Sequence, residues 1–249
     1  MTERKPKPIK PAIRIGAKDL GAINMPGFCP RCFWIKQKAK PMPFQIFPGI
    51  FSSIDAYTRK IIHASFDKNG RAPAWLPNFE HAITYLKVPH WSQFVRTDEK
   101  TGITISGVMD DLFEQVNGSV IIPDYKTAKF TKTQDALYPM YAAQLNAYAW
   151  IQEIMSPRPI GLLCLVYFEP KTKAPLKDTE FWPLPKYTKF GFDMEFTANT
   201  LVVERDPELV PGLLVKAKEI LSLPEPPIAT DGCKDCESLY RIKDMMGWI

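Results

Sequence analysis

One short stretch of the chain, residues 107 to 148, gathers the side chains best suited to do chemistry together. In the run Val120-Ile-Ile-Pro-Asp-Tyr-Lys126, Asp124 and Lys126 stand two residues apart. Side chains at i and i+2 of a β-strand point to the same face. A strand here therefore predicts that Asp124 and Lys126 project together, while Tyr125 points to the opposite face.

A hairpin is predicted to bring a second acid to this strand. Asn117-Gly118 favours a tight type I′ turn, in which both central residues need a positive φ. Segments 103–115 and 119–126 would then pair as antiparallel strands, which carries Asp110 towards Asp124.

A helix is expected to complete the group. Residues 137–155 are rich in alanine and long apolar residues, and Pro139 stands near the start, where a helix tolerates proline. Gln144 and Tyr148 are four residues apart and so lie on one face of that helix.

These residue types suit metal-dependent cleavage of a phosphodiester. Such a reaction requires a nucleophilic water and neutralisation of the charge that develops on phosphorus, and Mg²⁺ or Mn²⁺, which prefer oxygen ligands, provide both. Asp110 and Asp124 are the predicted ligands, with the Tyr125 carbonyl and Asp55 as tentative further ones. His63 stands behind Asp55 as a candidate, and for both the alternative is an ordinary surface position.

The remaining candidates would act beside the ion. Lys126 would position or polarise the water and stabilise negative charge. Gln144 and Tyr148 would orient Lys126 or contact the scissile strand. Asp111 is interpreted as a supporting or solvated acid that faces away from Asp110.

Four of the five cysteines form two Cys-x2-Cys pairs near opposite ends of the chain, Cys29/Cys32 and Cys233/Cys236. Two matched pairs predict a four-cysteine metal site that ties the two ends together. Spacing leaves zinc and an iron–sulfur cluster open, since both accept four thiolates. Two unrelated thiol pairs are the alternative. Cys164 lies in an apolar run and is interpreted as a small buried hydrophobe.

Composition sets broad limits on the protein class. The 249 residues suit one domain, or one domain with a small satellite, and 45% hydrophobic with 24% charged residues is ordinary for a globular protein. A net charge of +5 is a mild hint of a polyanionic partner. The sequence has no run of 18 apolar residues, no signal-peptide pattern and no GxxxxGK[ST] or GxGxxG motif, so we expect an intracellular protein without a membrane span.

The chain divides into three predicted parts: a basic tail, a main domain and a C-terminal cysteine segment that packs back on Cys29/Cys32. Their expected bounds are 1–18, 19–222 and 223–249. Within the main domain we predict further elements from local pattern: an amphipathic helix over 47–66, a loop over 67–90, a buried strand over 160–168, an edge strand over 180–184, and helices over 193–205 and 209–223. Residues 223–229 are proline-rich and predict a stiff linker.

Three motifs together carry a family resemblance. Gly107-x-x-Asp110, Asp124-x-Lys126 and Gln144-x3-Tyr148 resemble motifs of the PD-(D/E)XK nuclease superfamily, and in particular of RecB-type nuclease domains such as the CRISPR-associated adaptation exonucleases. The start Cys29-Pro-Arg-Cys32-Phe-Trp34 and the second cysteine pair resemble that branch as well. The resemblance spans roughly residues 27 to 240.

The resemblance implies a restriction-endonuclease-like α/β core, with a mixed central sheet flanked by helices. It also implies a metal-dependent deoxyribonuclease acting on single-stranded DNA or DNA ends, with a [4Fe-4S] cluster as a staple and protein partners in a repair, recombination or CRISPR-type complex. Two departures stand out: the cysteines are arranged two and two instead of one and three, which leaves Zn²⁺ open, and no residue fits the first motif cleanly.

Two other functions are compatible with the sequence. The protein could keep the nuclease fold but only bind nucleic acid, without catalysis. It could also be a zinc-ribbon-like adaptor in which the central acids form nothing more than salt bridges.

Overall fold

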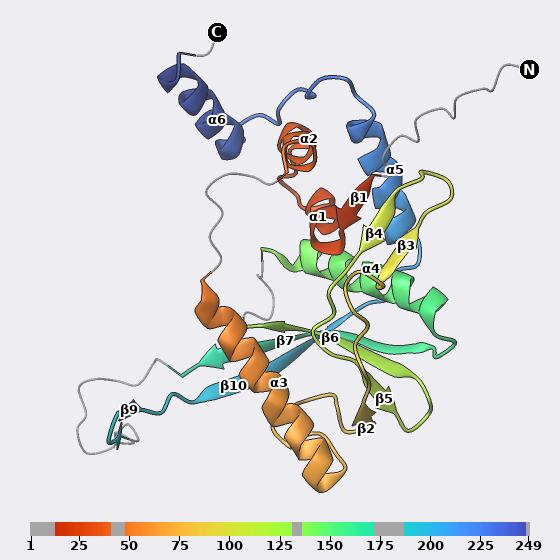
Figure 1. Cartoon of the computed structure of the whole chain (residues 1–249), viewed down its shortest axis with the longest axis vertical. Helices are drawn as coiled ribbons and strands as arrows, with labels where there is room; N and C mark the ends of the chain where they lie inside the picture. The colour runs from red at the N-terminus through yellow and green to blue at the C-terminus, as the bar shows by residue number, and fades with distance from the viewer. Residues whose placement is uncertain (1–12, 41–47, 131–135, 172–186, 248–249) are drawn as a thin grey trace, which may run out of the picture.

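The computed structural model describes residues 13–40, 48–130, 136–171 and 187–247 (Figure 1). The structure is a mixed α/β fold in which a five-stranded and a three-stranded mixed sheet are flanked by helices. The strands are β1 (Arg14–Gly16), β2 (Ala82–Tyr85), β3 (Val95–Thr97), β4 (Thr104–Ser106), β5 (Phe113–Gln115), β6 (Val120–Lys126), β7 (Ile160–Pro170), β8 (Tyr187–Thr188), β9 (Gly191–Phe192) and β10 (Phe196–Val203). The helices are α1 (Ala17–Gly21), the short 3-10 helix η1 (Ala22–Asn24), α2 (Pro30–Lys38), α3 (Gly49–Asn69), α4 (Tyr138–Met155), α5 (Leu209–Leu221) and α6 (Lys234–Met245).

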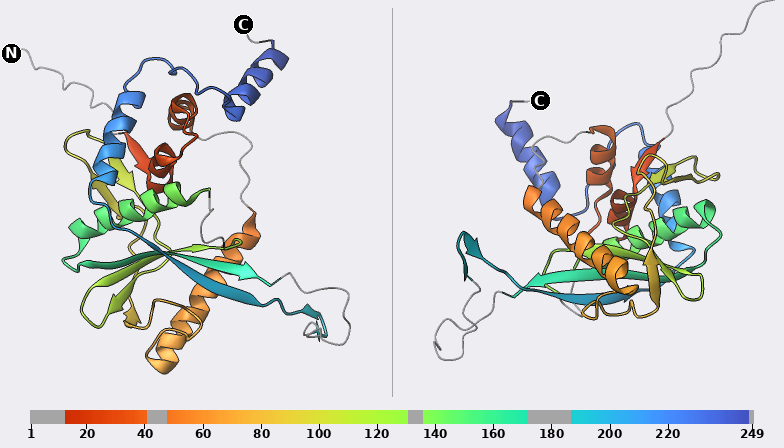
Figure 2. Two further views of the ribbon diagram at one scale, coloured as in Figure 1. Left: turned by 180° about the vertical axis from the view of Figure 1, so that it is seen from behind. Right: turned by 60° about the horizontal axis from the view of Figure 1, so that its bottom comes forward.

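The larger sheet has the strand order β10-β7-β6-β5-β2. Strands β6 and β7 are parallel neighbours joined through α4, and all other pairs in this sheet are antiparallel. A parallel pair requires such a crossover, and the helix that makes it packs back on the sheet. Helix α4 accordingly covers one face, and α3 crosses the other (Figures 1 and 2).

Side chains alternate between the two faces of β6, so the strand contributes to a separate hydrophobic core on each face of the sheet. Val120 and Ile122 belong to the core under α4, whereas Ile121 and Tyr125 belong to the core that contains Ile62 of α3. Because the side-chain period of a strand is two, the α4 face also receives positions 124 and 126. The polar end of β6 is therefore directed towards α4.

The smaller sheet, with the order β1-β4-β3, packs on the C-terminal half of α4, where Arg96 of β3 donates to the Trp150 carbonyl at 2.6 Å. Ile15 of β1 is fully buried opposite Ile105 of β4, and α1 packs on α4. The expected basic tail over 1–18 is therefore wrong at its C-terminal end, because residues 14–18 are structural. Residues 1–12 lie outside the described part of the chain.

Three predicted elements differ from the structure. Segment 193–205 contains strand β10 instead of a helix, because its threonine and valine side chains fit a pleated surface beside β7. Segment 67–90 includes the edge strand β2, and segment 103–115 is divided between β4 and β5, which belong to different sheets. The predicted edge strand over 180–184 lies outside the described residues. The helices over 137–155 and 209–223 and the strand over 160–168 are confirmed, within one or two residues at each end.

The hairpin at Asn117-Gly118 is confirmed, but the turn is of another type. Only Gly118 has a positive φ, 79°, and Asn117 does not. The Gly118 N–H donates to the Gln115 carbonyl at 2.9 Å, and the Gln115 N–H donates to the Ser119 carbonyl at 2.8 Å. This is a three-residue loop closed by a left-handed glycine, and it needs one glycine instead of two residues with positive φ.

Helix α3 forms as predicted but presents its apolar stripe differently. Ile50, Tyr57 and Ile61, which recur at helical spacing, are exposed, whereas Ile62 and Phe66 are buried against the sheet. Within the described residues no helix combines the length and apolar character that crossing a bilayer requires.

Gly107 lies where the chain passes between the two sheets, and its missing side chain leaves room for Tyr148. A Cβ atom at position 107 would stand 2.5 Å from Tyr148 Cε1 and 3.1 Å from Phe94 Cδ1. We predict that Gly107→Ala lowers the free energy of unfolding by about 1–3 kcal/mol through overpacking, measured by urea denaturation.

Gly212→Ala is the matched control, because no heavy atom lies within 4 Å of a Cβ at that helical position in α5. Alanine there should be neutral or stabilise by about 0.5–1 kcal/mol through helix propensity. Equal effects of the two substitutions would contradict the close packing of Gly107 on Tyr148.

Candidate functional site

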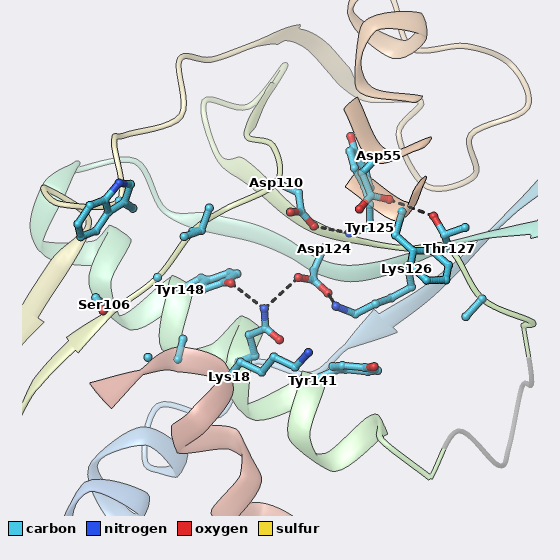
Figure 3. A pocket seen from close by; sticks show the side chains of 18 residues that line it. Lys18, Asp55, Ser106, Asp110, Asp124, Tyr125, Lys126, Thr127, Tyr141 and Tyr148 are labelled. Atoms are coloured by element: carbon cyan, nitrogen blue, oxygen red, sulfur yellow. Dashed lines mark hydrogen bonds and ion pairs between the residues drawn. The ribbon is translucent and has the colours of Figure 1, made fainter. Parts of the chain in front are cut away.

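A cavity of about 570 Å³ opens at the polar end of β6 (Figure 3). Its walls come from six parts of the chain: β6 and the residues after it, α4, the end of β4 with the segment after it, the turn before β3, the β1–α1 junction and α3. The residues that line it include all five predicted catalytic side chains, Asp110, Asp124, Lys126, Gln144 and Tyr148, together with Asp55 and Tyr125.

Asp124 is buried on the floor of this cavity, with 2% of its surface exposed. The Lys126 ammonium forms an ion pair with Asp124 Oδ2, and the Gln144 amide donates to Asp124 Oδ1 at 3.1 Å. Desolvation raises the pKa of Asp124, and the charge of Lys126 opposes that rise. The prediction that Asp124 and Lys126 project together is therefore confirmed by their ion pair.

Asp110 stands in the segment between β4 and β5 and meets β6 through the backbone. The Tyr125 N–H donates to Asp110 Oδ2 at 2.7 Å. Desolvation and, next, the negative charge of Asp124 raise the pKa of Asp110 to about 7. Two acids that repel one another in a desolvated site make an environment that favours a bound cation.

Gln144 and Tyr148 lie on one face of α4 and touch each other, as their spacing predicts. The Gln144 amide lies 2.6 Å from the Tyr148 hydroxyl, and burial, followed by the charge of Asp124, raises the pKa of Tyr148. Gln144 Oε1 is buried and has no hydrogen-bond partner among the described residues. This oxygen therefore adds an acceptor without a donor to the wall of the cavity.

Asp55 and the Tyr125 carbonyl are the two tentative ligands of the predicted metal ion. Asp55 lines the cavity from α3, and its Oδ1 accepts a hydrogen bond from the Thr127 hydroxyl at 3.0 Å. Across the described residues, the cysteines are the only set of three or more His, Cys, Asp or Glu side chains whose ligand atoms all lie within 4.8 Å of one another. Asp55, Asp110 and Asp124 together therefore do not form such a set, and Asp55 as a ligand stays a prediction. The Tyr125 carbonyl as a ligand stays a prediction.

The other face of β6 carries a polar network that sequence reasoning missed. Asp111 is fully buried, where His63 Nε2 lies 2.8 Å from Oδ2 and the Tyr125 hydroxyl donates to Oδ2 at 3.1 Å. Desolvation raises the pKa of Asp111, and the neighbouring His63 and Arg59 oppose that rise. Asp111 does face away from Asp110, but it is not a solvated acid, and His63 is directed to Asp111 instead of the cavity.

Tyr125 connects this network to the cavity. Its ring and hydroxyl belong to the α3 face, while its backbone N–H holds Asp110 on the α4 face. No local pattern identifies this network, because His63 and Asp111 are 48 residues apart and meet only in the fold. Lys18 and Trp91, which also line the cavity, reach it in the same non-local way.

The four cysteines form the second candidate site, at the junction of α2 and α6. Their sulfur atoms lie close enough together to hold a metal ion, with 3.3 Å between Cys32 Sγ and Cys236 Sγ. Cys29 and Cys233 are the N-cap residues of α2 and α6, and each partner stands three positions later, in the first helical turn. Both pairs therefore lie at helix N-termini, where the helix dipole favours thiolates.

Local donors favour a thiolate in this cluster. Burial acts to raise the pKa of Cys29, but hydrogen bonds from the N–H groups of Cys32 and Thr230 and from neighbouring thiols bring it to about 6. Burial and the neighbouring thiols raise the pKa of Cys32. Such a set binds a metal by releasing protons. Cys164 is fully buried in β7, apart from the cluster, as its apolar neighbours predict.

Comparisons with known proteins add little to this geometry. No protein-family model matches the sequence. No curated protein matches it either. A solved structure described as the crystal structure of SSO0001 is similar with a TM-score of 0.42 and 14% sequence identity, over 95% of this chain and 87% of that one. At this TM-score the likeness carries no argument about fold or function.

Removing one cysteine should release the metal and loosen the C-terminal helix, since Cys236 is the only buried residue described in α6. We predict that Cys236→Ser abolishes stoichiometric metal binding, measured by elemental analysis and visible absorbance of the purified protein. It should also make residues 234–245 sensitive to proteolysis. Cys164→Ser is the control and should keep the metal. Full metal content in Cys236→Ser would contradict a four-cysteine site.

The high pKa of Asp110 predicts a dependence of stability on pH. The folded protein holds this proton up to about pH 7, whereas the unfolded chain releases it near the ordinary value of 3.8. Because the folded state then binds more protons, the free energy of unfolding should fall as the pH rises from about 4 to 7 in buffer without added divalent cations. Denaturant titrations across this range should show a smaller fall for Asp110→Asn. An unchanged slope, equal to that of the exposed control Asp193→Asn, would contradict the assignment.

Proposed function

We propose that the protein is a divalent-metal-dependent deoxyribonuclease of the PD-(D/E)XK type. The observation that carries this proposal is the convergence of Asp110, Asp124 and Lys126 in one cavity, with Asp124 buried, Asp110 half-buried and the ammonium paired to Asp124. A structural salt bridge alone would not require a second desolvated acid that repels the first. Perturbed acids in a cleft are typical of functional sites.

The residues present fit a hard divalent cation. Asp110 and Asp124 offer carboxylate oxygens, and two such ligands suffice for Mg²⁺, which keeps several waters and also takes phosphate oxygens. Bound there, the cation would supply positive charge at the phosphate and activate a water molecule. Asp55, which lines the cavity from α3, would accept hydrogen bonds from water there.

Side chains of the protein would position the attacking water and stabilise the charge on the phosphate. Asp124 Oδ2 holds the Lys126 ammonium, and the ring of Tyr141, whose centroid lies 4.2 Å from Nζ, restricts it further. The ammonium would orient the attacking water and stabilise negative charge on the phosphate as that charge develops. Gln144, held between Asp124 and Tyr148, would keep Asp124 in place and offer Oε1 to a donor on the substrate.

Several features support a restriction-endonuclease-like core within the mixed α/β fold. The acids stand on a hairpin of the central sheet, and the helix with Gln144 and Tyr148 follows the strand with Asp124 and Lys126. This is the order in which the resemblance places the motifs. We propose single-stranded DNA or DNA ends as substrates. For the cysteines we propose a [4Fe-4S] cluster, with Zn²⁺ as the alternative.

Divalent-dependent degradation of end-labelled DNA tests the proposal. We predict that Asp110→Asn, Asp124→Asn and Lys126→Ala each lower the cleavage rate by about 100-fold or more with Mg²⁺ or Mn²⁺, because each removes charge from the reacting centre. Asp193→Asn, which changes an exposed acid outside the cavity, should leave the rate unchanged.

The result that contradicts the proposal is equal activity in all five proteins. Binding of DNA without cleavage in either metal would instead favour the second function, a nucleic-acid-binding protein that keeps the fold. The specific observation behind that alternative is that Asp55 does not join Asp110 and Asp124 as a third close acid.

A further inference from the structure

Trp91 differs from the other described tryptophans in its position. It lines the cavity that holds Asp110 and Asp124, yet 53% of its surface is exposed. Trp34 donates its indole N–H to the Leu223 carbonyl, and Trp75 packs edge-on against Phe168. Trp91 therefore presents an exposed aromatic surface at the site of the proposed chemistry.

The backbone around Trp91 is held firmly. The Phe94 N–H donates to the His90 carbonyl at 3.0 Å, and the Phe94 ring is fully buried beside Tyr148. From β1, Arg14 Nη2 donates to the Trp91 carbonyl at 3.4 Å. The exposed side chain thus stands on a turn that the core and a neighbouring strand fix in place.

A positive charge lies beside this aromatic surface. The Arg14 guanidinium lies 5.5 Å from the centroid of the Trp91 ring. Lys18, which follows on α1, lines the same cavity and acts on the charge of Asp124. An aromatic face next to cations is the arrangement that binds single-stranded nucleic acid, since bases stack on the ring and phosphates meet the charges.

The burial of Asp124 in a small cavity favours a single strand over an intact duplex at the reacting centre. Asp124 is 2% exposed, on the floor of a cavity of about 570 Å³, which is the size of a small-molecule site. A flexible strand whose neighbouring base is unpaired can direct a phosphate to Asp124 with fewer steric constraints than a rigid duplex. An unpaired base next to the entering phosphate needs a surface to stack on, and Trp91 offers one.

We propose that Trp91 is a stacking platform for an unpaired base of a single-stranded nucleic acid entering the cavity, with Arg14 beside the adjacent phosphate. The position of this base next to a cleaved bond rests on the proposed function. The binding itself does not, and it can be measured without catalysis.

The test uses an Asp124→Asn background in Mg²⁺ at one fixed salt concentration, with affinity for a fluorescent oligodeoxythymidine strand measured by anisotropy. Adding Trp91→Ala should weaken binding by about 5- to 100-fold, the range measured for loss of one stacked base. Trp91→Phe should restore most of the affinity. Trp75→Ala, which removes a tryptophan of similar exposure outside the cavity, should have no effect.

A strand with abasic units separates stacking from charge and from misfolding. It keeps its phosphates but offers no base, so Trp91→Ala should not weaken its binding further. Equal losses on both strands, equal affinities for the Trp91→Ala and Trp75→Ala proteins, or no binding of either strand would each overturn the proposal. If the wild-type enzyme fails to cleave DNA but Trp91 still governs base-dependent binding, the proposed function fails and the stacking platform stands.

Discussion

Two desolvated carboxylates constrain the structure more than any other feature. Asp124 and Asp110 lie on one face of the central sheet, where desolvation and mutual repulsion disfavour their charges. Three groups compensate: the Lys126 ammonium and the Tyr125 N–H from β6, and the Gln144 amide from α4. Each lies correctly only if the hairpin, the β6–α4–β7 crossover and the register of β6 are all in place. The geometry of the site therefore depends directly on the correct folding of the central sheet and α4.

The opposite face of β6 contributes to the same arrangement. Asp111, buried beside His63, accepts a hydrogen bond from the Tyr125 hydroxyl, while the backbone of Tyr125 holds Asp110. Consecutive acids in the segment before β5 are therefore anchored on two sides of one strand. A shift of β6 by one residue would exchange these faces and leave buried charges without partners on both. This network explains why α3, which carries His63, must cross that face of the sheet.

The sequence reveals the parts of the site whose geometry is local. Strand alternation brings Asp124 and Lys126 together, and helical spacing does the same for the glutamine and tyrosine of α4. Contacts between distant segments, such as that between His63 and Asp111, leave no periodic pattern in the sequence. Residues 193–205 became a strand because an edge of the sheet was available beside β7, which outweighs a weak helical preference. At Asn117-Gly118 the dipeptide marks the hairpin but does not determine the loop length, which the pairing of the flanking strands decides.

The cysteine cluster has a consequence for the order in which the molecule can be completed. Cys32 and Cys236 are separated by 204 residues, so a bound metal closes nearly the whole chain into a ring. In a chain-entropy view, a cross-link over a loop this long restricts the unfolded state by about 5 kcal/mol. During synthesis this ring cannot close until α6 has left the ribosome. A polypeptide that ends before α6 would carry every described residue of the cavity but would lack this closure.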